Sequence, residues 1–178
     1  MIPCRPCHVP ASAGKDRRLS HKKLQVIMMF QRILVPIDGS THSRRAVECA
    51  ADLATRYDAK LNLLHVITNV ARNRVPEELR DYAKLEQFEL NEADMLLGVA
   101  TKLVESARER ALELGLADVT QAIEPGNPAS VIAQYCQDHD IDLIVMGRRG
   151  LGDLGGLLIG SVSHKVSHLT DCPCMTVA

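Results

Sequence analysis

From residue 30 onward, short apolar runs alternate with longer segments in which apolar residues recur every three or four positions. The short runs predict five β-strands. They lie at residues 33–37, 61–67, 119–123, 141–146 and 174–177. The third run is the least apolar of the five and predicts an edge strand. Strands that alternate with helices are typical of an α/β fold with a parallel sheet.

Four amphipathic segments predict the helices between these strands. The first follows Ser40 or Thr41, either of which can cap it, and ends near Asp58. The second ends at Gly115, and the third begins at Asn127, which has the side chain of an N-cap. The fourth spans about residues 161–170. Each segment has one apolar face, so each helix is expected to pack on the sheet.

Right-handed crossovers favour an open five-stranded parallel sheet with strand order 3-2-1-4-5 and helices on both faces. In this order the second and third strands lie on one side of the first strand, and the fourth and fifth lie on the other. The winding of the chain therefore reverses between the first and the fourth strand. Ligands of such sheets bind beyond the carboxyl ends of the strands at that point. The loops at residues 36–40 and 147–160 are therefore expected to meet and to form a binding site.

Composition narrows the function classes. The chain has 178 residues, of which 46% are apolar and 24% charged, and it has no Trp. No apolar run approaches the roughly 20 residues of a membrane-spanning helix, so no membrane insertion is expected. The net charge is −1. Residues 1–28 are basic and leave a mildly acidic remainder, which argues against a nucleic-acid-binding surface.

Residues 1–28 lack helical or strand periodicity and are rich in proline and basic residues. They are interpreted as a disordered leader or as a misassigned start, because Met28 and Met29 directly precede the first strand. The leader contains Cys4, Cys7 and His8 in the C-x-x-C-H spacing of haem attachment, and a haem or zinc role there is the less favoured alternative. The remaining cysteines are expected in or near the core, in a reducing cytoplasm.

Six of the eleven glycines fall between residues 147 and 160, after a strand and before a helix that begins with Ser161. Glycines let backbone N–H groups approach an anion, and the helix N-terminus adds partial positive charge. The hydroxyls of Ser161 and Ser163 are expected as further donors, and Arg149 as a balancing charge. A bare flexible loop is the alternative. No Gly-Lys pair occurs, which excludes a Walker A loop.

The glycine loop, read with two other motifs, resembles the universal stress protein family. The loop has the pattern Gly147-x2-Gly150-x9-Gly160-Ser161, the opening strand is followed by Asp38-Gly39-Ser40, and the chain closes on Cys172-Pro173-Cys174. The resemblance covers residues 30–178. It implies an adenine nucleotide α-hydrolase-like fold, with residues 29–178 as a nucleotide-binding domain that binds ATP or a related adenine nucleotide.

Carried over to this sequence, the resemblance implies a role for ten residues. Asp38 would contact the ribose or adenine end, although a helix N-cap is the alternative for this residue. Pro36 and Ile37 would line the adenine slot, and Val66 would offer backbone groups to the base. The remaining residues would lie at the ribose and phosphates: Gly147, Gly150, Gly160, Ser161, Val162 and Ser163. Arg149 joins this set from its charge alone.

The resulting expectation is a cytoplasmic, ATP-binding regulatory protein of the stress response, whose nucleotide-dependent surface is bound by a regulated protein of unknown identity. The cofactor is ATP, with or without Mg²⁺ or Mn²⁺. The last strand has no following crossover, so its edge is expected to pair with a second copy in a homodimer. No nucleophile with a base is identifiable, which predicts slow or no turnover. A slow ATPase and an interaction module with an empty site are the alternatives.

Overall fold

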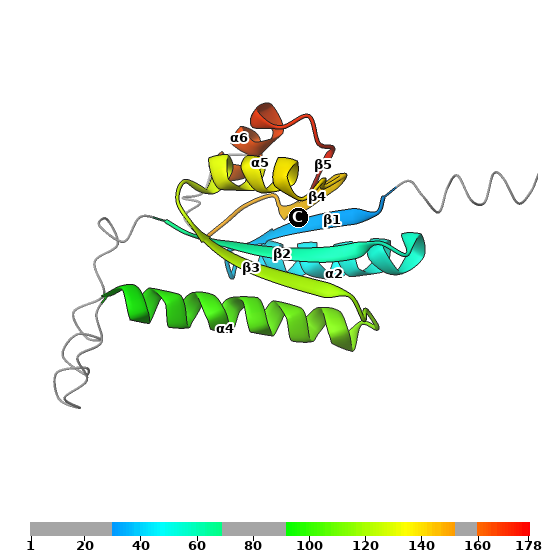
Figure 1. The fold of residues 1–178 in the computed structure, drawn as a ribbon, viewed down its shortest axis with the longest axis horizontal. Helices are drawn as coiled ribbons and strands as arrows, with labels where there is room; N and C mark the ends of the chain where they lie inside the picture. Colours follow the sequence, from blue (N-terminus) through cyan, green and yellow to red (C-terminus); the bar gives the residue numbers. More distant parts are fainter. Residues whose placement is uncertain (1–29, 69–91, 152–159) are drawn as a thin grey trace, which may run out of the picture.

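Five parallel strands form one sheet in a computed structural model that describes residues 30–68, 92–151 and 160–178. The order of the strands is β3-β2-β1-β4-β5 (Figure 1). Their bounds are β1 (Arg32–Ile37), β2 (Lys60–Ile67), β3 (Val119–Pro125), β4 (Leu143–Gly147) and β5 (Cys174–Val177). The predicted fold class, the strand order and the edge position of β3 are confirmed.

Helices cover both faces of the sheet. Of the helices in the described residues, two lie on one face and two on the other (Figure 1). The first pair is α2 (Thr41–Tyr57) and α4 (Glu92–Glu113), and the second pair is α5 (Pro128–Asp138) and α6 (Ser161–Leu169). All four helices agree with the amphipathic segments of the sequence, which end within a residue or two of the observed bounds.

Each face of the sheet has its own apolar core. Alternate residues of β1 point to opposite faces, so Ile33 and Val35 enter the core with α2 and α4, whereas Leu34 enters the core with α5 and α6. The predicted inner face of α2 is buried, with Ala46 and Ala50 fully inaccessible to solvent. These small side chains let α2 approach the sheet closely and bring its first turn over the end of β4.

Two strand boundaries differ from the sequence pattern by two residues. The apolar run at residues 141–146 begins before β4, because Ile141 is buried in a turn in which its N–H donates to the carbonyl of Cys136. Burial without strand pairing explains this apolar residue. In contrast, β3 extends beyond the apolar run to Pro125, which is paired with Ile67 of β2.

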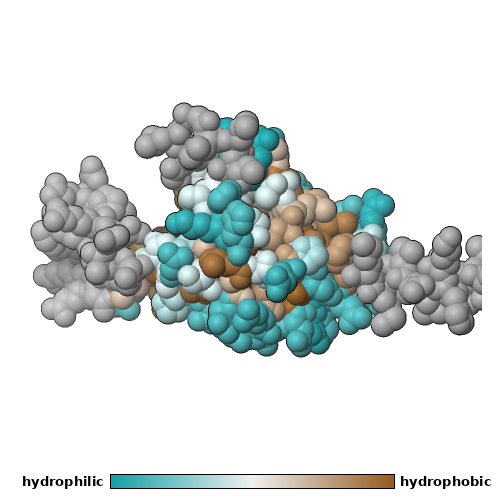
Figure 2. Space-filling view, turned by 90° about the horizontal axis from the view of Figure 1, so that it is seen from above, coloured by the Kyte–Doolittle hydropathy of each residue, from teal (hydrophilic) through white to brown (hydrophobic). Residues whose placement is uncertain are grey.

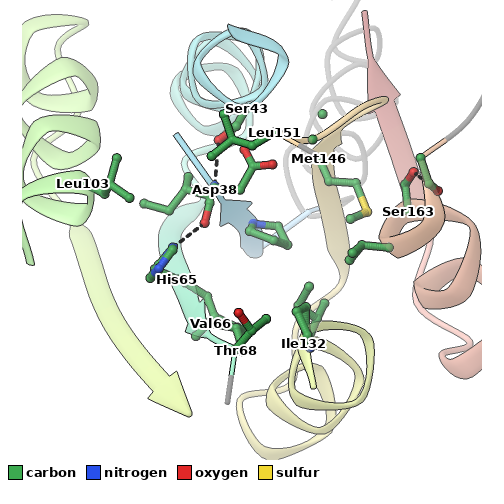
Figure 3. Close-up of a pocket in the computed structure, with 18 of the residues that line it drawn as sticks. Asp38, Ser43, His65, Val66, Thr68, Leu103, Ile132, Met146, Leu151 and Ser163 are labelled. Atoms are coloured by element: carbon green, nitrogen blue, oxygen red, sulfur yellow. Dashed lines mark hydrogen bonds between the residues drawn. The ribbon is translucent and has the colours of Figure 1, made fainter. Parts of the chain in front are cut away.

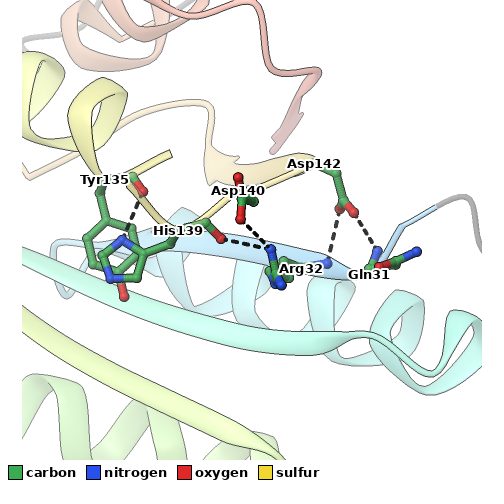
Figure 4. A network of polar contacts seen from close by, with 6 residues as sticks. All are labelled: Gln31, Arg32, Tyr135, His139, Asp140 and Asp142. Carbon is green, nitrogen blue, oxygen red and sulfur yellow. Dashed lines mark hydrogen bonds and ion pairs between the residues drawn. The ribbon is translucent and has the colours of Figure 1, made fainter. Parts of the chain in front are cut away.

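The amino edge of the sheet is held by paired polar groups (Figure 4). One carboxylate oxygen of Asp142 accepts the backbone N–H of Gln31 at 2.6 Å, and the other accepts that of Arg32 at 3.2 Å. The guanidinium of Arg32 forms an ion pair with Asp140 at 2.9 Å. These contacts join the starts of β1 and β4. A ligand site is expected at the other end of the strands, where their carboxyl ends lie.

Apolar and hydrophilic residues are interspersed on the molecular face seen from above Figure 1, where tan and brown patches lie among teal and white ones (Figure 2). In the described part of the chain, no helix is long and apolar enough to cross a membrane.

The predictions for the leader, including Cys4, Cys7 and His8, lie outside the described residues. The same is true of the part of the glycine loop at residues 152–159.

Candidate functional site

The carboxyl ends of β1, β2 and β4 surround a pocket with a cavity volume of about 960 Å³, to which α4, α5 and α6 also contribute (Figure 3). This volume lies at the upper end of the range for small-molecule sites. All eleven residues singled out from the sequence line this pocket. The reversal of the winding between β1 and β4 therefore brings the two distant loops together, as expected.

Asp38 directly follows β1 and faces the loop after β4. Its Oδ1 atom accepts the backbone N–H of Ser40 at 2.9 Å. A Cβ atom on Gly150 would lie only 2.6 Å from its Oδ2 atom, so the second oxygen faces the backbone of that loop. The N-cap of α2 is Ser40, whose hydroxyl accepts the N–H of Ser43 at 3.1 Å. The N-cap alternative for Asp38 is thus wrong.

Gly147, Gly150 and Gly160 lie where a Cβ atom would crowd its neighbours. A Cβ atom on Gly147 would lie 2.9 Å from both backbone and side-chain atoms of His42, in the first turn of α2. A Cβ atom on Gly160 would lie 3.0 Å from the carbonyl oxygen of Arg148. None of these three glycines has a positive φ. Their common requirement is therefore space and not an unusual backbone conformation: Gly147 and Gly150 let the end of β4 and its loop pack against α2 and Asp38, and Gly160 lets the start of α6 pack against Arg148.

The N-terminus of α6 faces the pocket without a side-chain cap. Its N-cap residue, Gly160, has no side chain, and no side chain of the described residues caps this helix with a hydrogen bond. The first N–H groups of a helix have no partner within the helix, so those of Ser161, Val162 and Ser163 need one from elsewhere. All three residues line the pocket. Such a helix N-terminus attracts anionic groups.

The hydroxyl of Ser163 is already used within the protein. The side chain is only 4% exposed, and its Oγ lies 3.0 Å from the carbonyl oxygen of Gly160 and 3.3 Å from that of Arg148. A hydroxyl that donates to a backbone carbonyl is not available to a phosphate. In this rotamer the hydroxyl is used by the backbone, which leaves the backbone N–H as the donor that Ser163 offers to the pocket. The expected contact between the hydroxyl and a phosphate stays a prediction.

Arg149 lies at the rim of the pocket beside the first turn of α2. Its carbonyl oxygen lies 3.4 Å from the hydroxyl of Ser40, which joins the post-β4 loop to the N-cap of α2. The side chain is half-buried and lines the pocket. A cationic side chain at this point is suited to balance an anionic ligand.

Apolar side chains form the walls of the pocket that the sequence analysis did not assign to it. They come from four different elements, which is why no single motif indicated them. Those in helices and strands are Leu64 and Ile67 (β2), Leu96, Val99 and Leu103 (α4), Pro128 and Ile132 (α5) and Met146 (β4), and Leu151 adds one from the loop after β4. Together with Pro36 and Val66, they offer an apolar slot that suits the face of a purine.

Two polar side chains in the pocket, His65 and Ser43, were also missed. Nδ1 of His65 lies 2.8 Å from the carbonyl oxygen of Ile37, and the hydroxyl of Ser43 accepts the backbone N–H of Asp38 at 3.3 Å (Figure 3). The sequence offered only a lone histidine in a strand and a serine in a helix. Their common target becomes visible only once β2, α2 and the end of β1 are placed together.

Three thiols gather beside α5, away from the pocket lining. Burial is the main cause that raises the pKa of Cys136 to about 12 and that of Cys172 to about 11. The charge of Cys174 adds to both shifts, whereas the hydrogen bond with Cys136 lowers the pKa of Cys172. Burial also raises the pKa of Cys174. These thiols pack with the core of α5 and α6, as expected from the sequence. Among the described residues, no cluster of His, Cys, Asp and Glu side chains is arranged to hold a metal ion.

Residues 29–178 match the sequence model of the universal stress protein family. Universal stress protein YxiE of Bacillus subtilis is 35% identical over 163 residues, which cover 84% of this chain and 99% of that relative. A solved universal stress protein in complex with cAMP has a TM-score of 0.62 at 26% identity, covering 84% of this chain and 98% of the other. A family member from Arabidopsis thaliana with AMP bound has a TM-score of 0.56 at 25% identity, covering 83% and 90%.

Proposed function

The chain belongs to the universal stress protein family, and we propose that it is a regulatory member that binds ATP at the carboxyl edge of its sheet. The observation that carries this proposal is the N-terminus of α6, whose N-cap residue is a glycine without a capping side chain. This helix end lies in one pocket with the carboxylate of Asp38 and an apolar slot. Residues 29–178 act as the nucleotide-binding domain in this proposal. The AMP and cAMP complexes of the two relatives described above support an adenine nucleotide as the ligand class.

The adenine and ribose would occupy the part of the pocket between β1 and β2. Pro36, Ile37 and Val66 line this part, and backbone groups at the end of β2 are suited to the polar edge of the base. The carboxylate of Asp38 has an oxygen facing the post-β4 loop. A carboxylate only accepts hydrogen bonds when ionised, and ribose hydroxyls are donors of matching chemistry.

The phosphates would lie at the N-terminus of α6. The backbone N–H groups of Ser161, Val162 and Ser163 are the proposed donors, with Gly147 and Gly150 allowing the loop to approach and Arg149 balancing the charge. A bound Mg²⁺ or Mn²⁺ would be held mainly through the phosphates, because Mg²⁺ commonly combines one or two carboxylates with phosphate oxygens. Asp38 is the carboxylate of the described pocket lining that could join such a set.

The proposed output is a nucleotide-dependent surface for a protein partner in the cytoplasm, during a stress response, with slow or no hydrolysis. Phosphoryl transfer requires an oriented nucleophile and positioned charge at the γ-phosphate. The described pocket lining contains two serines of α6 and Ser43, but its histidine, His65, is bonded to a backbone carbonyl. This arrangement supports nucleotide holding over catalysis.

We further propose a homodimer through β5. This strand is at the edge of the sheet, pairs only with β4 among the described strands, and is partly exposed, with Met175 at 38%. An unpaired strand edge is a template for pairing with a second copy. Removal of residues 173–178 is expected to yield monomers in analytical ultracentrifugation, and an unchanged dimer would contradict this part.

Mass spectrometry of small molecules released from the purified full chain tests the nucleotide proposal. We expect adenine nucleotide in the released fraction, and ATP largely intact after incubation with the protein and Mg²⁺. The variant Gly160→Trp, which places a large side chain at the start of α6, is expected to release none. Steady hydrolysis that this variant abolishes would favour the slow ATPase. A wild-type protein that neither carries nor binds nucleotide would leave an interaction module with an empty site.

A further inference from the structure

One peptide unit at the end of β1 is held from two sides by side chains of other elements. Its carbonyl group belongs to Ile37 and lies 2.8 Å from Nδ1 of His65, on β2. Its N–H group belongs to Asp38 and donates to the hydroxyl of Ser43, on α2, at 3.3 Å. Figure 3 shows both contacts next to the pocket. The strand ends at this peptide, so side chains take over its hydrogen bonds where the ladder stops.

The carbonyl contact determines the tautomer of His65. A carbonyl oxygen can only accept, so Nδ1 carries the hydrogen and donates it. In the neutral ring, Nε2 is then an acceptor. The histidine is half-buried and lies opposite Ile37 in the register of β1 and β2. Its ring is thus fixed both by the strand and by its hydrogen bond.

The peptide group held by His65 and Ser43 joins Ile37 to Asp38 and directly precedes the Cα atom of Asp38. Rotation of this peptide would turn the carboxylate, one oxygen of which accepts the N–H of Ser40 while the other faces the loop at Gly150. Ser43 is only 3% exposed, and its own N–H is bonded to Ser40, so α2 holds the hydroxyl of Ser43 rigidly against this peptide. A preorganised carboxylate binds more tightly, because less ordering is left for the binding step.

We propose that His65 and Ser43 are positioning residues for the nucleotide: they clamp the Ile37–Asp38 peptide and so aim the Asp38 carboxylate at the ribose hydroxyls. This inference rests on the proposed function and deepens it. The two side chains set selectivity for a ribonucleotide sugar through Asp38. They need no contact of their own with the ligand.

Isothermal titration calorimetry of the full chain with ATP and with 2′,3′-dideoxy-ATP tests the clamp, because the second ligand lacks both ribose hydroxyls. His65→Leu removes the donor to Ile37 and is expected to weaken ATP binding about five- to tenfold, the value of roughly one hydrogen bond. Binding of the dideoxynucleotide is expected to change less than about twofold. Ser43→Ala is expected to show the same selective loss, and it serves as the second variant if His65→Leu does not fold.

Two substitutions at residue 65 separate positioning from direct contact. His65→Asn keeps an N–H at the same number of bonds from Cα as Nδ1, and it is expected to recover most of the ATP affinity that His65→Leu loses. His65→Gln moves the N–H outward and is expected to resemble His65→Leu. In an Asp38→Asn background, His65→Leu is expected to have no further effect on ATP, because the group that it positions has been changed.

The outcomes distinguish the failure of the clamp from the failure of the function. An equal loss of both ligands in His65→Leu would overturn the clamp and assign the histidine a general structural role. Recovery by His65→Gln but not by His65→Asn would also overturn it, in favour of direct contact through Nε2. A wild-type chain that binds neither ligand would instead refute the nucleotide function itself.

Discussion

The N-termini of α5 and α6 both lie at the carboxyl edge of the sheet, yet they are completed in opposite ways. In α5, the side chain of Asn127 accepts the N–H groups of Ala129 at 3.2 Å and Ser130 at 3.3 Å. In α6, the equivalent position is Gly160, and within the described part of the chain no side chain caps the helix. The first helix satisfies its amides from its own sequence, whereas the second leaves them for another partner.

This difference indicates which of the two helix ends serves binding. Asparagine is among the best N-cap residues, and its replacement by alanine costs about 0.5–2 kcal/mol. The α6 helix forgoes this side-chain stabilisation and keeps a site where an anion can accept from backbone amides. Ser40 completes α2 in the same way as Asn127 completes α5, so α6 is the exception among α2, α5 and α6 at this edge.

The largest expected effect comes from making α6 resemble α5. Gly160→Asp supplies a carboxylate cap at a residue whose φ of −66° and ψ of 154° suit an ordinary side chain. The carboxylate would occupy the amides and repel phosphate, so we expect ATP affinity to fall about 30- to 100-fold, or roughly 2–3 kcal/mol. Isothermal titration calorimetry measures this loss.

Two controls make this comparison sharper. Gly160→Ala adds the same Cβ atom beside the carbonyl oxygen of Arg148 but no carboxylate, so the difference between the two variants isolates the effect of the cap. Asn127→Ala removes the cap of α5 and is expected to lower the free energy of unfolding by about 1 kcal/mol while leaving ATP affinity unchanged. If Gly160→Asp bound ATP as tightly as Gly160→Ala does, the open helix end would have no role in binding.

Gly147→Ala is expected to be the most destabilising of the small substitutions, because it forces β4 away from the first turn of α2. Its Cβ atom would lie 2.9 Å from the backbone of His42, and overpacking of this kind costs about 1–3 kcal/mol. The matched control is Gly98→Ala in α4, where the added Cβ meets nothing within 4 Å and the better helix propensity is expected to add about 0.5–1 kcal/mol. Urea denaturation compares the two, and equal shifts would contradict the tight contact.

Ser163→Ala separates the hydroxyl of the open helix end from its amide. Because the hydroxyl bonds to backbone carbonyls, its loss is expected to lower the free energy of unfolding by about 1 kcal/mol. ATP affinity is expected to change less than about threefold, since the backbone N–H is retained. A loss of affinity as large as that of Gly160→Asp, without a loss of stability, would restore the hydroxyl as a phosphate donor.

The smallest effect is a pH dependence on the α5 side of the molecule. Burial raises the pKa of Cys136 from 9.0 to about 12 and that of Cys172 to about 11, so both thiols keep their protons in the folded state after the unfolded chain loses them. Their contribution to stability is complete below pH 9 and declines as the pH rises above it. Urea denaturation at pH 8 and pH 10 is expected to show a smaller decline in Cys136→Val than in the wild type. An identical decline would contradict the raised pKa.

Most of the fold was predictable because each element has its own periodic signal. The apolar run of β1, the small-residue face of α2 and the Asn127 cap of α5 all depend on neighbours within a few residues. The strand order followed from the handedness of the connections. The predicted start of β4 was two residues early, because the buried Ile141 belongs to a turn and hydrophobicity alone does not distinguish a turn from a strand.

The candidate site was predictable only where it is continuous in sequence. The glycine loop and Asp38 are local motifs, and all the residues chosen from them line the pocket. The partners His65 and Ser43 were not found, because their role depends on one peptide shared by three elements. The bonds of the Ser163 hydroxyl to backbone carbonyls were not foreseen, because they depend on how the start of α6 meets Arg148.

An NMR titration of the full chain with ATP tests the role of the open helix end through the backbone amides of α5 and α6. We expect large shifts for the amides of Ser161, Val162 and Ser163, and much smaller ones for the capped amides of Ala129 and Ser130. Unmoved α6 amides at saturating ATP, or equal shifts at both helix starts, would contradict the claim that α6 is left open to hold the phosphates.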